Sequence, residues 1–298
     1  MLFDLKFLKS LKILNIIAKR FFKGQKLGHR KSVQRGASLE FAEYKKYQHG
    51  DDLRFIDWNL YGRFETLYIK KFHNQESLNV SILLDCSQSM NFGNPSKFDF
   101  GRKMAAAISF IALQYQDSVR IFSFSDEINA ISSEGFRPSH IHNLMGFLEK
   151  CSPASGNAPF ESIAEKFLAK NKRPGVVFVI SDCLFEKEVE IGLKKIKHKK
   201  NEINLVQILS REEVNPELGG LVELIDSETS SILKVQINKN LLMVYEEILR
   251  ERFDEMRSFV KKMGMKYHRA ITDSPFEASV LSLFGHGGTG NPNVGTIS

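Results

Sequence analysis

Asp85, Ser87 and Ser89 form an Asp-x-Ser-x-Ser motif that begins directly after an apolar run at residues 80–84. The run has the length and composition of a buried parallel strand. Alternate residues in an extended turn beyond such a strand can direct a carboxylate and two hydroxyls toward one point, and hard cations such as Mg²⁺ or Mn²⁺ take oxygen ligands of this kind. The motif therefore predicts a divalent-metal site. The structural alternative is that Asp85 and Ser87 cap a turn or a helix.

A second acid, Asp182, stands at the end of another apolar run at residues 176–180. In parallel sheets, ligands bind outside the carboxyl ends of the strands, at the point where the strand order reverses. We therefore expect Asp182 to lie near Asp85 and to support the metal indirectly. Coordination positions would then remain for waters and for an acidic group of a partner.

Strand-like and helix-like segments alternate from residue 79 to residue 284. This alternation predicts an α/β fold, with a doubly wound, mostly parallel sheet and helices on both of its faces. A hairpin is expected at residues 222–225 and 232–235. The other strands are expected at residues 80–84, 118–124, 176–180, 203–209 and 265–270, and the helices at residues 98–115, 139–149, 160–170, 189–199, 241–263 and 275–284.

Charge and composition divide the chain into four parts. Residues 1–35 form a basic arm and linker with ten Lys and Arg against one acid, whereas the remaining 263 of the 298 residues carry 32 basic and 34 acidic side chains. The high pI therefore comes from the arm, and no nucleic-acid surface is expected on the folded body. Residues 36–78 form a small, partly β accessory segment, residues 79–284 the α/β domain, and residues 285–298 a Gly-rich tail that we expect to be disordered.

The arm carries apolar residues at helical spacing and lysines on the opposite side. Two interpretations stay open: residues 1–23 pack as a helix on their own domain or on a partner, or they lie as a basic amphipathic helix on an anionic membrane. No membrane span and no secretory signal are expected. Three cysteines without a paired spacing indicate a reducing compartment. We expect a cytoplasmic protein, which would associate with membranes if the arm binds lipid.

The accessory segment holds a dense group of charged and aromatic residues. It could form a recognition surface with Trp58 as an aromatic anchor, or an ion-pair and capping network that fixes one subdomain to another. The second interpretation is favoured. The residues are Glu40, Asp51, Asp52, Arg54, Asp57, Trp58 and Arg63.

Two resemblances follow from these motifs. Asp-x-Ser-x-Ser-Met after a strand, with a later strand ending in Ser-Asp, resembles the metal-ion-dependent adhesion site of von Willebrand factor type A domains. The Gly-Asp-Asp-Leu-Arg-Phe-Ile-Asp-Trp element at residues 50–58, with its flanking residues, resembles the bacterial family catalogued as domain of unknown function 58. That resemblance runs from about Gly28 to about Phe284.

The resemblance implies a type A-like domain whose members are not established enzymes and which acts with a MoxR-type AAA+ ATPase. It carries Asp85, Ser87, Ser89 and Asp182 over as metal-site residues. The family usually has Gly-Gly-Thr-Asp-Leu in a third motif, with the Thr as a metal ligand. This chain has Gly-Asn-Ala-Pro-Phe at residues 156–160, so Ala158 replaces the Thr and the metal should be held more weakly. Asn157 or Ser155 could offer an oxygen instead, but their spacing assigns neither.

The predicted function is a non-enzymatic protein-interaction module that assists the assembly or maturation of other proteins. Two alternatives stay open: a metal-dependent hydrolase or phosphatase at Asp85 and Asp182, and a peripheral membrane adaptor that uses the N-terminal helix. The sequence contains neither a G-x-S-x-G elbow nor a phosphate-binding G-x-x-x-x-G-K-[ST] loop. Cys86 and Cys183 each follow a strand-end Asp, so we expect them to be small buried residues that lie close together.

Overall fold

The computed structural model describes residues 2–14, 39–74, 77–156, 158–183, 188–226 and 231–284 of the chain. The residues group into two units, one formed by Leu27–Leu78 and the other by Met1–Lys26 together with Asn79–Ser298. Residues 15–35 of the predicted arm and the predicted tail at residues 285–298 lie outside the described residues.

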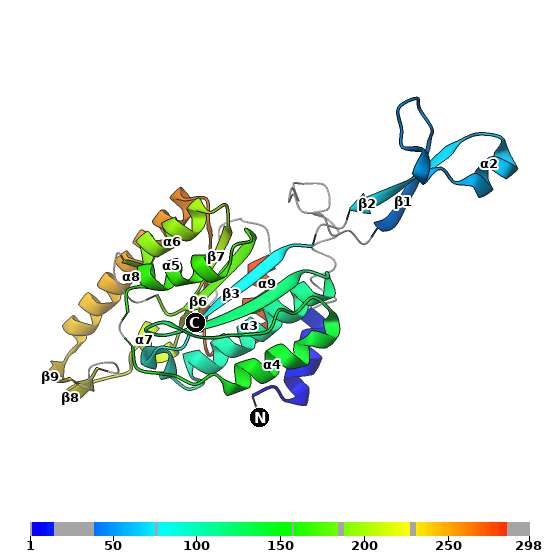
Figure 1. Cartoon of the computed structure of the whole chain (residues 1–298). Helices are drawn as coiled ribbons and strands as arrows, with labels where there is room; N and C mark the ends of the chain where they lie inside the picture. The colour runs from blue at the N-terminus through cyan, green and yellow to red at the C-terminus, as the bar shows by residue number, and fades with distance from the viewer. Residues whose placement is uncertain are drawn as a thin grey trace. The chain divides into compact units, whose positions relative to one another are not determined.

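The larger unit is built on a six-stranded sheet with the order β10-β7-β6-β3-β4-β5 (Figure 1). Five strands are parallel, and β5 pairs antiparallel with β4 at one edge. The chain moves from β3 outward to β4 and β5 and then returns to β6 on the other side of β3, so the strand order reverses between β3 and β6. The bounds are β3 (Asn79–Asp85), β4 (Ser118–Phe124), β5 (Ile128–Ile131), β6 (Val176–Ser181), β7 (Glu202–Leu209) and β10 (Lys266–Ile271).

Helices cover both faces of this sheet, as the alternating pattern predicts (Figure 1). One face packs against α5 (Phe160–Lys170), α6 (Glu188–His198) and the second half of α8 (Lys239–Lys262) in a single apolar cluster. The other face packs against α3 (Lys97–Gln114), where Gly101 lets the helix approach Leu84, Ile180 and Ile208 of three strands. Because the central strands are buried on both faces, they are near-continuous apolar runs. The mixed α/β fold with a mostly parallel sheet is confirmed.

The start of the chain packs on the same unit. Residues 5–14 are helical, and the apolar side chains Phe3, Phe7, Leu11 and Leu14 are buried. The Phe7 ring lies 5.6 Å from that of Phe276 in α9 (Phe276–Phe284). The described part of the arm therefore uses its apolar face inside its own domain, as the first of the two interpretations has it.

Shorter elements complete this unit. They are the 3-10 helices η2 (Gln88–Asn91) and η3 (Pro138–His140), the helices α4 (Ile141–Lys150) and α7 (Arg211–Val214), and a two-stranded ribbon of β8 (Gly220–Ile225) and β9 (Ile232–Ile237). The ribbon confirms the predicted hairpin. No described helix combines the length and the apolar content that a membrane span requires.

The smaller unit consists of an antiparallel pair, β1 (Leu39–Lys46) and β2 (Tyr68–Asn74), with two short helices between them. These helices are η1 (Leu53–Phe55) and α2 (Trp58–Phe64). Asp52 caps η1 and Asp57 caps α2, so the acids of the Gly-Asp-Asp element set where each helix begins.

Candidate metal centre

Two buried acids stand side by side where the strand order of the sheet reverses. Asp85 is the last residue of β3, and Asp182 directly follows the last residue of β6. The two strands pair in parallel with Leu84 level with Ile180, so both carboxylates lie at the same end of the sheet. Asp85 is 6% exposed and Asp182 is fully buried. The sequence therefore places two carboxylates at the position where α/β sheets bind their ligands.

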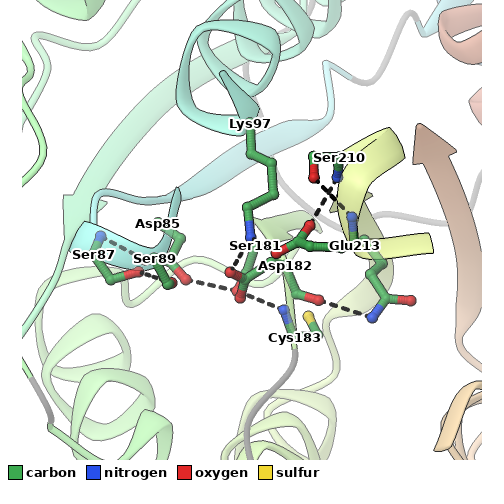
Figure 2. A network of polar contacts seen from close by, with 10 residues as sticks. Asp85, Ser87, Ser89, Lys97, Ser181, Asp182, Cys183, Ser210 and Glu213 are labelled. Carbon is green, nitrogen blue, oxygen red and sulfur yellow. Dashed lines mark hydrogen bonds and ion pairs between the residues drawn. The ribbon is translucent and has the colours of Figure 1, made fainter. Parts of the chain in front are cut away.

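Backbone and hydroxyl groups hold the Asp85 carboxylate in place. Its Oδ1 accepts a hydrogen bond from the Ser87 backbone N–H at 2.8 Å, and its Oδ2 accepts one from the Ser181 hydroxyl at 2.6 Å. The hydroxyls of Ser87 and Ser89 lie 3.0 Å apart. Figure 2 shows these side chains lying together at the carboxyl ends of the strands. The structure thus brings together the three residues of the Asp-x-Ser-x-Ser motif.

A buried lysine that the sequence did not single out stands beside Asp182. Lys97, the first residue of α3, is fully buried, and its ammonium donates to Asp182 Oδ2 at 2.8 Å and to the carboxylate of Glu213 (Figure 2). Glu213 is fixed by a capping box at the start of α7, in which the Ser210 backbone N–H donates to Glu213 Oε2 at 2.8 Å. Lys97 therefore bridges two acids that belong to different elements.

The loop between η2 and α3 approaches this capping box closely. Gly93 has a φ of +92°, and a side chain there would place its Cβ 2.6 Å from the Cβ of Ser210. Only glycine has both the backbone freedom and the small size that this contact needs. The glycine thus lets the loop that leads into Lys97 pack on the loop that leads into Glu213.

Among the described residues of this site, negative charge exceeds positive charge. Asp182 and Glu213 share the ammonium of Lys97, Asp85 forms no ion pair with a described residue, and Asp182 Oδ1 is a buried acceptor without a hydrogen-bond partner. Burial, and next the charge of Asp182, raise the pKa of Asp85 to about 6, although hydrogen bonds from Ser181 and Ser87 act in the opposite direction. A divalent cation would supply the missing charge, so the residues present fit such an ion.

The family of the chain follows from its sequence. A profile described as protein of unknown function DUF58 matches residues 43–255. The chain belongs to this DUF58 family. Related proteins of Mycobacterium bovis and of Mycobacterium tuberculosis, both described as uncharacterized, are 24% identical over 245 residues, which cover 80% of this chain and 76% of theirs.

Several solved structures resemble this DUF58 protein over 70% of its length. The conserved hypothetical protein BatB from Bacteroides thetaiotaomicron aligns over 96% of its own chain with a TM-score of 0.46 and 15% identity. An aerotolerance-related membrane protein from Bacteroides fragilis aligns over 96% of its chain with a TM-score of 0.41 and 14% identity. The pilus adhesin SpaC from Lactobacillus rhamnosus GG aligns over 29% of its chain with a TM-score of 0.40 and 12% identity.

The loop before α5 contributes no side-chain oxygen from Ala158 to this site. This residue packs against the apolar cluster beneath the sheet, and Asn157 lies outside the described residues. The same loop is hydrogen-bonded to the Asp-x-Ser-x-Ser motif, because the Ala154 backbone N–H donates to the carbonyl oxygen of Cys86 at 2.8 Å. In the described part of the chain, no three His, Cys, Asp or Glu side chains gather as a metal-binding group. A cation here would therefore depend on hydroxyls and waters as well as on Asp85.

The cysteines at the site are buried thiols. All three cysteines of the chain are free, and both Cys86 and Cys183 are buried, as expected. The thiol of Cys86 donates to the Leu84 carbonyl oxygen at 3.6 Å and also interacts with the thiol of Cys151, a residue that the sequence did not suggest; the interaction with Cys151, and next burial, raise the pKa of Cys86. Burial also raises the pKa of Cys183. Both thiols stay protonated at neutral pH and are poor nucleophiles.

The acids of the smaller unit serve its local structure. Asp51 accepts from the Lys45 ammonium at 3.1 Å and from the Gln48 backbone N–H at 2.9 Å. Asp52 forms a bidentate ion pair with Arg54. Both partners of each of these contacts lie inside the smaller unit, so the expectation that the network fixes one subdomain to another stays a prediction.

The remaining residues of that group are spread over the smaller unit. Asp57 is buried and accepts from the Asn59 backbone N–H at 3.0 Å and from the Tyr44 hydroxyl at 3.0 Å. Trp58 is 66% exposed and packs edge-on against Tyr61. Arg63 is exposed on α2, and Glu40 lies in β1 opposite His73. The structure does not gather these residues into one site.

Proposed function

We propose that Asp85, Ser87, Ser89 and Asp182, which we call the strand-end cluster, form a non-enzymatic binding site. The site would take up a divalent cation and, through it, an acidic group of a protein partner. The observation that carries the proposal is the excess of negative charge among the described residues where the strand order reverses: Asp182 Oδ1 is buried without a hydrogen-bond partner, the Lys97 ammonium is shared by Asp182 and Glu213, and Asp85 has no ion-pair partner. Buried carboxylates are retained in folded proteins when they are paired or when they bind metals.

Asp85, Ser87 and Ser89 would hold the ion, with Asp182 acting through a bound water. Mg²⁺ and Mn²⁺ accept such a set, because they bind a few protein oxygens and keep several waters. Because Ala158 has no side-chain oxygen, water and the partner would supply more of the metal's ligands. An Asp or Glu side chain of the partner would complete the site, and metal and partner would each strengthen the binding of the other.

The chemistry of the cluster favours binding over hydrolysis. The neighbouring thiols of Cys86 and Cys183 are held protonated, so neither offers the thiolate that a cysteine nucleophile needs. The partner class to test first is a MoxR-type AAA+ ATPase, and the role would lie in the assembly or maturation of other proteins.

Calorimetric titration of the full chain with Mn²⁺ and Mg²⁺ tests the cation site. We expect one ion per chain for the wild type and at least a roughly tenfold loss of affinity for Asp85→Asn, which keeps the shape of the side chain but removes its charge. Asp117→Asn is the matched control, because Asp117 is a buried acid just before β4, at the opposite end of the sheet. Equal affinity in Asp85→Asn and wild type, or no binding by the wild type, would overturn the proposal.

The partner is tested separately with the MoxR-type ATPase of the same organism. Its binding to the immobilised full chain should be strong with Mg²⁺ and should drop with EDTA or with Asp85→Asn. Binding that ignores both changes would place the contact elsewhere on the chain.

A further inference from the structure

The ribbon of β8 and β9 exposes apolar side chains on both of its faces. Leu221 and Ile225 point to one side and Leu224 and Leu233 to the other, and Leu221 is 72% exposed. The two strands pair only with each other among the described strands, so each has an open edge. A two-stranded ribbon is marginally stable in water unless a third strand or another apolar surface covers it. The exposed apolar side chains and open edges of the ribbon therefore indicate that another surface packs against it.

The helix that follows the ribbon has the same property over its first half. Its apolar stripe is buried at Leu249 and Val260, and Val260 belongs to the apolar cluster beside the sheet. At helical spacing toward the N-terminus, the stripe continues through Ile248, Tyr245 and Leu241, all of which are exposed. The first half of α8 thus continues the apolar stripe past the residues at which the described part of the domain buries it. Figure 1 shows the ribbon at this end of α8.

The ribbon and residues 241–248 together form what we call the ribbon face. The exposed large apolar residues of this region, from Leu218 to Ile248, are 38–72% exposed, whereas Val222, Val235 and Leu242 are half-buried. At roughly 100 Å² for each half-exposed side chain, the ribbon face presents on the order of 1,000 Å² of mostly apolar surface. The largest apolar patch of a typical monomer covers about 300–600 Å². Each partner in a stable protein–protein interface contributes about 800 Å², so the ribbon face is large enough for one if the partner covers both sides of the ribbon.

Charge distinguishes between the surfaces that could cover it. Residues 218–248 contain two basic side chains, Lys234 and Lys239, against five acids. Membrane-surface elements are rich in Lys and Arg, so an anionic bilayer does not fit. Glu223 is neutralised by Lys234 at 2.8 Å across the ribbon, so two copies of the ribbon can meet without opposing like charges there.

We propose that the ribbon face is a self-association interface that a second copy of this chain covers. Two copies related by a two-fold axis would bury the same residues on each side and bring the open ribbon edges within reach of each other. The cation site is not needed for this contact. The dimer and the proposed function can therefore fail independently.

Sedimentation velocity on the full chain, from micromolar to submillimolar concentration, tests the interface. We expect the wild type to sediment as a species of twice 34.0 kDa. Leu233→Lys/Val244→Lys should weaken dimerisation by roughly 100-fold or more, because each change buries an unpaired charge in place of an apolar side chain. Ile191→Lys is the matched control, since Ile191 is a partly exposed apolar residue on α6, outside the ribbon face. Its sedimentation should match the wild type.

Circular dichroism of each variant should match the wild type, because the substituted residues are exposed. A wild type that stays monomeric throughout this range would overturn the proposal. So would a dimer that survives Leu233→Lys/Val244→Lys. A monomer that sediments with phosphatidylethanolamine–phosphatidylglycerol vesicles would assign the ribbon face to a membrane and would equally refute self-association.

Discussion

The strand-end cluster and the smaller unit both gather acidic residues, but their charges are treated in opposite ways. In the smaller unit, Asp51 is half-buried and pairs with Lys45, and Asp52 is exposed and pairs with Arg54. At the strand ends, Asp85 and Asp182 are buried; Asp182 shares the ammonium of Lys97 with Glu213, and Asp85 accepts hydrogen bonds but forms no ion pair with a described residue.

The pKa values of the two regions express the same difference. Hydrogen bonds from Arg54 lower the pKa of Asp52 to about 2, whereas burial and the charge of Asp182 raise that of Asp85 to about 6. Compared with water, the surroundings of Asp52 stabilise its ionised form, whereas those of Asp85 destabilise it. A high density of acids thus says little about function by itself. Burial combined with too little positive charge is what distinguishes a cation site from a capping network.

The largest effect is expected when Lys97 loses its charge. Lys97→Met leaves Asp182 buried without its ion-pair partner and should lower the free energy of unfolding by about 3–5 kcal/mol. The matched control in the other region is Lys45→Met, which breaks a partly exposed pair and should cost less than about 1 kcal/mol. Urea denaturation followed by circular dichroism measures both.

A second substitution sharpens this comparison. Asp182→Asn in the Lys97→Met background removes the unpaired charge and should recover at least roughly 1 kcal/mol of the loss. Equal costs for Lys97→Met and Lys45→Met would show that burial does not separate the two regions.

A smaller effect is expected from pH in the absence of divalent ions. The pKa of Asp85 is about 6 in the folded chain against 3.8 for the ordinary group, so the folded state binds the proton more tightly. The contribution of Asp85 to the free energy of unfolding is therefore fully present below pH 3.8 and is lost as the pH rises through 6. The loss is on the order of 3 kcal/mol.

Asp85→Asn should flatten this part of the pH profile and make the metal-free protein more stable than the wild type above pH 6. Urea denaturation at a series of pH values gives the comparison. Parallel wild-type and variant profiles would mean that Asp85 is not destabilised by its surroundings.

The smallest effect is expected at the cap of α2 in the smaller unit. Asp57→Ala removes the acceptor for the backbone N–H groups of Asn59 and Leu60 and should cost about 1 kcal/mol of local stability. Hydrogen exchange of these two amides should accelerate, whereas amides of β3 and β6 should keep their wild-type rates. Asp57→Ser, which can still cap, should exchange more slowly than Asp57→Ala, and a loss of protection in β3 would contradict a purely local role.

Much of the fold could be predicted because apolar strands and amphipathic helices leave regular patterns. The runs that end at Asp85 and at Asp182 are buried on both faces, which is why their length and composition identify them as central strands. The ribbon could also be predicted as a hairpin. Its exposure could not, because burial depends on what the rest of the chain packs against it.

The charge balance of the site could not be predicted in the same way. Lys97 and Asp182 are 85 residues apart, and Lys97 and Glu213 are 116 apart, so no local pattern connects them. One signal was present for Glu213: Ser210 and Glu213 have the spacing of a capping box directly after a strand, which places the glutamate at the strand ends. The contact of Cys86 with Cys151 likewise depends on how the loop after α4 packs beside the Asp-x-Ser-x-Ser motif.

Mn²⁺-induced broadening of amide NMR signals tests the central claim most directly, because a paramagnetic ion reports where it binds. In a titration of the full chain with substoichiometric Mn²⁺, the amides of Asp85, Ser87, Ser89 and Asp182 should broaden first. Those of Asp51, Asp52 and Asp57 in the smaller unit should remain sharp. Broadening that begins in the smaller unit, or that spreads evenly over exposed acids and spares the strand ends, would contradict the account.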